Sequence, residues 1–258
     1  MGGLAMTPPL LEIRGLTRRF QGLVAVNDVS TQVASHEMVG LIGPNGAGKT
    51  TLFNLISGFL PPSAGDIVFE GRSLVGLKPH RIARLGIGRT FQNLRTMPNM
   101  TVFDNVSIGA LATFGQTPWQ ALLGGRNATS DSISRLTRDV LEQAHLSAQA
   151  GELAANLSYG RRKYLEIARA LATRPKLLIL DEPAAGLNDT ETAELADFLS
   201  GLVRRGLTVL LVEHDMSLVM SICQSVIVLA SGSKIADAAP DVVQRDPLVL
   251  ESYLGAGD

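Results

Sequence analysis

Short, continuous apolar runs recur along the chain. Runs that are apolar at nearly every position are typical of strands buried in the middle of a parallel sheet. They lie at Met38–Ile42, Leu177–Asp181, Leu207–Val212 and Ser225–Leu229. Shorter strands are expected at Leu10–Ile13, Val29–Val33 and Asp66–Glu70. Because several of these β-rich pieces precede or follow a glycine-rich loop, they indicate a small antiparallel sheet beside the parallel one.

Between the strands, apolar residues return every three or four positions, which is the period of an amphipathic helix. Helices are expected at Thr51–Gly58, Pro79–Gly86, Val102–Leu111, Ile133–Leu141, Ser158–Ala172, Thr190–Arg205, Met216–Cys223 and Asp246–Leu254. The segment Gly115–Ser132 lacks the period and contains glycine and proline, so it is expected to be a connecting loop. The alternation of strands and helices predicts an α/β fold.

Composition narrows the class of protein. The chain has 258 residues, 45% of them hydrophobic and 18% charged, with a net charge of −1. This length predicts one large domain with an insertion, or a domain plus a subdomain, and the balanced charge argues against nucleic acid as a partner. Cys223 is the only cysteine, so an intrachain disulfide is excluded. We see no secretory signal and no apolar run long enough to cross a bilayer, so we expect a soluble protein whose membrane role, if any, is through a partner.

The motif with the clearest chemistry is Gly43–Thr50, which reads G-x-x-x-x-G-K-T between an apolar strand and a helix. Glycines allow the backbone to turn its N–H groups toward a phosphate, and the helix N-terminus adds positive potential. Lys49 can reach the β- and γ-phosphates, and the Thr50 hydroxyl can ligate Mg²⁺. The alternative is a glycine turn that binds nothing. The residues expected to contact the nucleotide are Gly43, Asn45, Gly46, Gly48, Lys49, Thr50 and Thr51.

Polar residues follow two of the buried strands. Asp181 and Glu182 come at the end of one, and His214 comes just after another. Ligands of open α/β sheets bind at the carboxyl ends of the strands. There Asp181 suits the Mg²⁺ shell, Glu182 can polarise an attacking water, and His214 can donate a hydrogen bond to a γ-phosphate. Taken alone, a strand-to-turn Asp-Glu-Pro and a structural histidine are the alternatives.

Three further residues are ambiguous when each is considered alone. Phe20 could stack on an adenine ring or lie in the core. Gln92, after a strand-like piece, could ligate Mg²⁺ or position the attacking water; its alternative is an ordinary surface glutamine. Ser158 is a plausible N-cap that places its hydroxyl at a positive helix end. Its alternative is an ordinary capped helix whose basic residues, Arg161–Lys163, form a solvated face.

Taken together and in this order, these stretches resemble the nucleotide-binding subunit of ABC transporters over almost the whole chain. Gly43–Thr50 resembles the Walker A loop, Gln92 the Q-loop, Leu157–Arg161 the signature motif, Leu177–Asp181 Walker B, Glu182 the catalytic glutamate, His214 the switch histidine and Phe20 the A-loop aromatic. Because these motifs occur together and in the order of the family, we interpret Gln92, Ser158 and His214 as site residues and not as ordinary surface or structural residues. Two positions depart from the family pattern: Arg161 stands where glutamine is usual, and Asn188 where aspartate is common.

The resemblance implies a RecA-like P-loop NTPase core with a mostly parallel sheet, an antiparallel β subdomain and an inserted α-helical subdomain. The core with its β subdomain would comprise residues 10–93 and 172–258, the helical subdomain about 94–171, and residues 1–9 a flexible N-terminus. It also implies ATP and Mg²⁺ as cofactors. Two such subunits, identical or sisters, would clamp two ATP molecules head to tail, with Ser158 and Gly160 of one facing the nucleotide held by Lys49 of the other.

Within the family, Gly86–Asn93, Leu157–Gly160, Glu182–Asn188 and the ending Arg245–Gly255 resemble the high-affinity branched-chain amino acid importers, most of all the longer of their two ATP-binding subunits. That resemblance implies two membrane permease subunits, an external solute-binding protein that acts indirectly, and a peripheral location on the cytoplasmic face of the inner or plasma membrane. Other readings are an ATPase of a related amide, urea or other amino acid importer, a soluble ABC ATPase outside transport, and a subunit that binds ATP without hydrolysing it.

Overall fold

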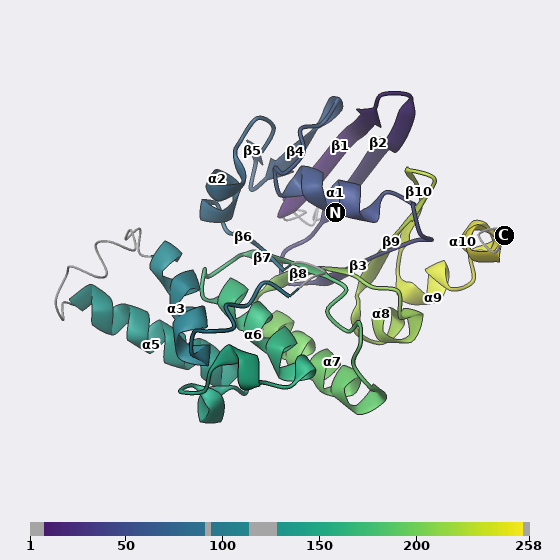
Figure 1. Ribbon diagram of the computed structural model, residues 1–258. Coiled ribbons are helices and arrows are strands. Elements are labelled where there is room, and N and C mark those ends of the chain that lie inside the picture. The colour runs from purple at the N-terminus through teal and green to yellow at the C-terminus, as the bar shows by residue number, and fades with distance from the viewer. Residues whose placement is uncertain (1–7, 91–93, 114–127, 255–258) are drawn as a thin grey trace, which may run out of the picture. The chain divides into compact units, whose positions relative to one another are not determined.

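The computed structural model describes residues 8–90, 94–113 and 128–254. The chain forms two compact units: residues 1–82 with 199–258, and residues 83–198. Strands and helices alternate in an α/β fold (Figure 1), as the sequence predicts. The subdomain boundaries proposed from the sequence stay a prediction. Of the N-terminus expected to be flexible, residues 1–7 lie outside the described ranges.

The first unit contains an antiparallel sheet with the strand order β2-β1-β4-β5. Its strands are β1 (Leu11–Phe20), β2 (Leu23–Val33), β4 (Ala64–Phe69) and β5 (Arg72–Ser73). Leu11 pairs with Val33 and Phe20 with Leu23, so β1 and β2 form a hairpin whose tip follows Phe20. The small antiparallel sheet predicted from the sequence is thus confirmed, with longer strands than the apolar pattern indicated.

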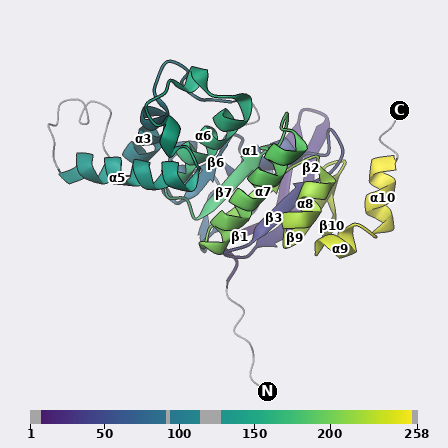
Figure 2. The same ribbon diagram turned by 90° about the horizontal axis from the view of Figure 1, so that it is seen from below.

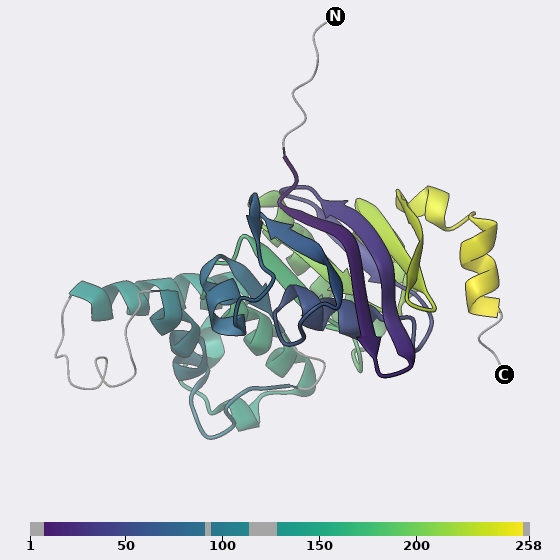
Figure 3. The same ribbon diagram turned by 90° about the horizontal axis from the view of Figure 1, so that it is seen from above.

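The buried strands of this unit are β3 (Met38–Ile42), β8 (Thr208–Val212) and β9 (Ser225–Ala230). β3 runs parallel to both neighbours, and every residue of β3 and β8 is buried. β10 (Ser233–Ala238) pairs antiparallel with β9 and lies beside β2 (Figure 3). The sequence did not predict β10, because its residues are only half-buried and form no apolar run.

The first unit also contains helices, which contact both its parallel and its antiparallel strands. They are α1 (Lys49–Ile56), α8 (Met216–Ile222), α9 (Pro240–Val243) and α10 (Pro247–Leu254). α1 lies between the antiparallel sheet and β3 (Figures 1 and 2). α8 approaches β3 closely, since a Cβ on Gly40 would stand 2.7 Å from Val219. Cys223 is buried, and burial raises the pKa of its thiol to about 12, so this side chain serves packing.

The second unit is mainly helical. α3 (Val102–Thr113), α5 (Ala128–Gln143) and α6 (Tyr159–Leu171) contact one another, and β6 (Ile87–Arg89) runs parallel to β7 (Leu177–Asp181). The unit also holds the 3₁₀ turns η1 (Ser147–Gln149) and η2 (Ala154–Asn156), while α2 (Pro79–Arg84) and α7 (Asp189–Arg204) extend across the boundaries between the units. α5 begins at Ala128, so the expectation of a loop to Ser132 is wrong at its C-terminal end. No helix in the described ranges is long and apolar enough to span a bilayer.

Candidate functional site

The loop between β3 and α1 folds around the ammonium group of Lys49. The Lys49 side chain is only 6% exposed, and its Nζ donates to the carbonyl oxygens of Gly43 at 2.6 Å and Pro44 at 2.9 Å. The loop is closed further by the Ala47 amide, which donates to Pro44 O at 3.2 Å. Because only neutral carbonyl groups of the loop accept these two hydrogen bonds, a bound anion can compete with them for the ammonium group.

The glycines of this loop have separate roles. Gly43 (φ 149°) and Gly48 (φ 101°) lie against backbone, because a Cβ would stand 2.1 Å from Leu229 O and 2.4 Å from Ala25 O respectively. Gly46 (φ 79°) has no atom within 4 Å of the position of a Cβ. Two glycines therefore permit close packing, and the third leaves its backbone open to a ligand. Asn45 and Thr50 are exposed and Thr51 is half-buried, so the fold leaves the start of α1 accessible.

His214 follows the carboxyl end of β8, at the same edge of the sheet as the loop of Gly43–Thr50. Leu41 pairs with Val212 in the parallel register of β3 and β8, so Gly43 and Glu213 both follow the ends of neighbouring strands. His214 is exposed, and its amide donates to the buried Glu213 carboxylate at 3.2 Å. α8 starts right after it with Asp215 as N-cap. His214 therefore lies just after the carboxyl end of a strand, as the sequence predicts.

Phe20 ends β1 at the tip of the β1–β2 hairpin, and its side chain is 37% exposed. The alternative of a core phenylalanine is therefore wrong. The guanidinium carbon of Arg18 lies 4.5 Å from the centre of the ring, so one face of the ring is covered by a cation. Stacking of the other face on an adenine stays a prediction.

In the second unit, Asp181 lies at the carboxyl end of β7 and is held from β6. Arg89 Nη2 is 3.4 Å from Asp181 Oδ2, and both side chains are less than a tenth exposed. The Asp181 amide donates to the Thr90 hydroxyl at 3.4 Å. Burial lowers the pKa of the Arg89 guanidinium, and the Asp181 carboxylate opposes that fall. Sequence reasoning missed Arg89, although a charged residue inside an apolar strand-like stretch is a signal that could have found it.

Glu182 follows Asp181 in a left-handed backbone conformation with φ 50°. A residue other than glycine costs about 1–2 kcal/mol in this region, so neighbouring contacts must hold it there. Its carbonyl oxygen accepts from the Ala185 amide at 3.2 Å and from Lys163 Nζ at 3.1 Å. Lys163 is buried, with 3% of its surface exposed, so the solvated basic face considered for Arg161–Lys163 is wrong at this residue.

Ser158 is the N-cap of α6, as predicted, and its Oγ accepts from the Arg161 amide at 3.3 Å. Its side chain is exposed at the positive end of the helix. Gly160 is buried, and a Cβ there would stand 2.8 Å from the Glu191 carboxylate. Gly160 therefore serves close packing on the start of α7 as well as any contact with nucleotide.

The two departures from the family pattern have local structural roles. Asn188 caps α7 reciprocally: its Oδ1 accepts from the Glu191 amide at 2.9 Å, and its own amide donates to the Glu191 carboxylate at 3.1 Å. Asparagine caps a helix as well as aspartate does. Arg161 Nη1 donates to His145 O at 3.4 Å, within the same unit. Neither residue replaces a side chain assigned to chemistry.

Gln92 lies outside the described residues. A further residue that the sequence did not assign to the site is Tyr253 in α10. Burial raises the pKa of its phenol, and a hydrogen bond from the Gly43 backbone opposes that rise.

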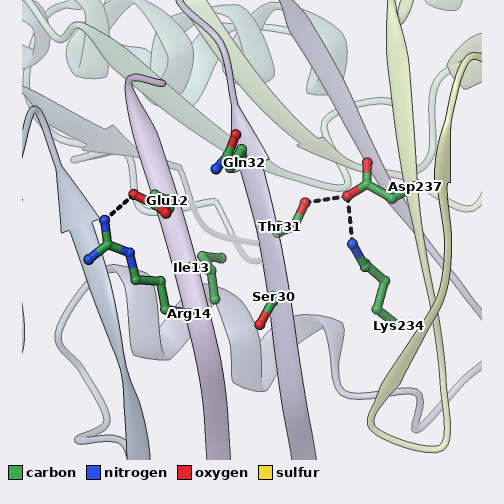
Figure 4. A pocket seen from close by; sticks show the side chains of 8 residues that line it. All are labelled: Glu12, Ile13, Arg14, Ser30, Thr31, Gln32, Lys234 and Asp237. Atoms are coloured by element: carbon green, nitrogen blue, oxygen red, sulfur yellow. Dashed lines mark hydrogen bonds and ion pairs between the residues drawn. The ribbon is translucent and has the colours of Figure 1, made fainter. Parts of the chain in front are cut away.

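A separate hollow of about 520 Å³ lies over β1, β2 and β10 (Figure 4). Its charges are paired within the lining. Lys234 Nζ and Thr31 Oγ1 both donate to Asp237, at 2.8 and 2.7 Å, and Arg14 donates to Glu12. Because these side chains bond to one another, the hollow lacks the free positive charge that a triphosphate needs.

Comparisons with known proteins agree on one family. The family model described as "ABC transporter" matches residues 26–185, and one described as "Branched-chain amino acid ATP-binding cassette transporter" matches residues 233–258. The chain is 42% identical to the high-affinity branched-chain amino acid transport ATP-binding protein BraF of Pseudomonas aeruginosa, over 97% of this chain and 99% of that protein. It is 42% identical to LivG of Escherichia coli, with the same coverage.

More distant relatives share the cassette. The lipopolysaccharide export system ATP-binding protein LptB of Acidithiobacillus ferridurans is 35% identical, over 95% of this chain and 97% of that protein. Among solved structures, the ADP conformation of MJ1267, an ATP-binding cassette of an ABC transporter, superposes with a TM-score of 0.85 at 31% identity, covering 96% of this chain and all of that one. The predicted fold and family are therefore confirmed.

Proposed function

Because this chain belongs to the ABC transporter ATP-binding family, we propose that it binds and hydrolyses ATP to power the uptake of branched-chain amino acids through a membrane permease. The observation that carries ATP binding is the loop of Gly43–Thr50, with Lys49 buried among its carbonyls and Gly46 open to a ligand. The substrate class is supported by the match of residues 233–258 to the branched-chain family, and by the relatives named for that transport.

Mg²⁺ would be held by Thr50, Asp181 and Gln92. In nucleotide sites this ion is bound by one or two protein ligands together with the phosphates, and it neutralises charge that develops during phosphoryl transfer. An exposed hydroxyl at the start of α1 and a carboxylate at the end of β7 fit that pattern. The described residues contain no cluster of three or more acidic, histidine or cysteine side chains that could hold a metal without a nucleotide.

The chain's own residues supply positioning and charge. Lys49 would transfer from its loop carbonyls to the β- and γ-phosphates. Glu182 would polarise the attacking water, and His214 would donate a hydrogen bond to the γ-phosphate. Phosphoryl transfer requires little covalent help, so such groups account for most of the catalysis.

The proposal includes a second ATPase subunit, identical or a sister, arranged head to tail. Ser158 at the exposed end of α6 would then complete the nucleotide site of the neighbouring subunit. ATP would favour the closed dimer, and closing would move two permease subunits at the cytoplasmic face of the membrane. An external binding protein would deliver the solute to them.

The substrate class is tested by reconstituting the chain with its membrane partners and binding protein in vesicles. We expect leucine, isoleucine or valine to stimulate ATP hydrolysis several-fold. The solute-free complex is the control. Stimulation by urea or short amides and not by these amino acids would contradict the branched-chain assignment while leaving the ATPase intact.

The role of Asp181 is tested through its ion pair. Arg89→Met should lower the stability of the nucleotide-free chain, because breaking a buried ion pair costs up to about 3–5 kcal/mol. Mg²⁺·ATP should then raise the melting temperature more in the variant than in the wild type, since the metal supplies charge that Asp181 has lost. ATP with EDTA should raise both equally. Arg84→Met, at an exposed arginine of α2, is the matched control. Equal stabilisation by Mg²⁺·ATP would contradict Asp181 as a metal ligand.

A further inference from the structure

The turn that carries Glu182 is held by the first turns of α6 at three points. We call residues Glu182–Leu187 the catalytic turn. Lys163 Nζ donates to the Glu182 carbonyl at 3.1 Å, and a Cβ on Gly186 would stand 3.0 Å from the Tyr159 ring. A Cβ on Gly160 would stand 3.5 Å from the Leu187 side chain. The first turns of α6 thus contact the catalytic turn near both of its ends, at Glu182 and at Gly186–Leu187.

Lys163 is the polar contact of the three. Its surface is 97% buried, and an ammonium is costly to bury unless a hydrogen bond or a charge compensates it. Within the described ranges, the structure gives it the Glu182 carbonyl and the face of the Tyr159 ring, 5.6 Å from Nζ to the ring centre. The cation is therefore directed at the main chain of the residue assigned to water activation.

The main chain of Glu182 needs such a contact. Its φ of 50° lies in the left-handed region, and the residue is not a glycine. The Glu182 carbonyl already accepts the Ala185 amide at 3.2 Å, the hydrogen bond that closes the turn. Lys163 donates a charge-assisted hydrogen bond to the same oxygen, and this second contact helps to hold the strained backbone of Glu182 in place.

We propose that Lys163 is a positioning residue for Glu182: by donating to the Glu182 carbonyl, it holds the catalytic turn in the conformation from which the carboxylate acts. The inference rests on the proposed role of Glu182 in hydrolysis. Lys163 acts through the backbone of Glu182 and has no part in binding the nucleotide.

The test uses the full-length chain with Lys163→Met, which keeps an unbranched side chain but removes the donor, and Lys163→Arg, which keeps a donor. In Lys163→Met, kcat should fall about tenfold to a hundredfold, the range for a lost hydrogen bond from a charged group. The affinity for ATP should stay within about twofold, and Lys163→Arg should recover part of kcat. Lys78→Met, at an exposed lysine, should match the wild type.

Two readouts separate positioning from a general loss of structure. Single-turnover hydrolysis should show that Lys163→Met has no further effect in the Glu182→Gln background, because both changes act on one group. Deuterium exchange should become faster at the Ala185 amide of the catalytic turn and stay unchanged in the C-terminal half of α6. An equal fall of kcat in both backgrounds, a matching loss of ATP affinity, or unchanged exchange of the turn would overturn the inference.

The outcomes also distinguish this inference from the proposed function. If Glu182→Gln alone keeps wild-type turnover, the assignment of Glu182 fails, and the role of Lys163 fails with it. If Glu182→Gln loses turnover while Lys163→Met keeps kcat, only the positioning role is wrong.

Discussion

The Glu182→Gln variant is expected to bind ATP as the wild type does and to hydrolyse it about 10²–10⁴-fold more slowly, the usual contribution of a general acid–base group. The substitution replaces a carboxylate by an amide of the same shape, so the backbone contacts of the catalytic turn are kept. Its polar group loses the capacity to accept a proton from water. The measurement is steady-state phosphate release, with ATP affinity determined separately by equilibrium binding.

The control for this variant is Glu142→Gln, which removes the same charge from an exposed site on α5. It should leave both turnover and affinity unchanged. Wild-type turnover in Glu182→Gln would remove Glu182 from catalysis. A fall of turnover in Glu182→Gln would also decide between an active ATPase and a subunit that binds ATP without hydrolysing it, because only an active ATPase has turnover to lose.

The parallel strands and the positions of Lys49, Asp181 and His214 could be predicted from local pattern alone. Each of these residues directly follows an apolar run or lies in a motif of fixed spacing, and the structure places each near the carboxyl end of a buried strand. Parallel pairing then brings the ends of β3 and β8 to one edge, as sheet geometry requires. For these elements, short-range sequence holds the necessary information.

Contacts between distant segments could not be predicted in the same way. Lys163 looks like one of three basic residues on a solvated helix face, and only tertiary packing shows that it is buried and donates to the Glu182 carbonyl. The ion pair of Arg89 with Asp181 joins residues that are 92 positions apart. β10 could not be predicted, because this half-buried edge strand has no apolar run. Phe20 was ambiguous because exposure at a hairpin tip depends on pairing, not on composition.

Lys49→Ala is expected to lower the affinity for ATP by about tenfold to a hundredfold, the range for losing hydrogen bonds from a charged group. The buried ammonium, now 2.6 Å from Gly43 O and 2.9 Å from Pro44 O, is the cation that we propose binds the β- and γ-phosphates. Hydrolysis should fall as well, because the same charge neutralises the transferred group. Equilibrium titration with a fluorescent ATP analogue measures the affinity, and phosphate release at saturating ATP measures the turnover.

Removing Lys49 also takes a donor from two carbonyls of the loop, so the variant's melting temperature must be measured beside its affinity. Lys78→Ala, at an exposed lysine, is the control. Full affinity in a folded Lys49→Ala protein would contradict the assignment of Gly43–Thr50 as the phosphate-binding loop. A loss of affinity here, with affinity retained in Glu182→Gln, would separate the group that binds the triphosphate from the group that activates water, as two distinct roles require.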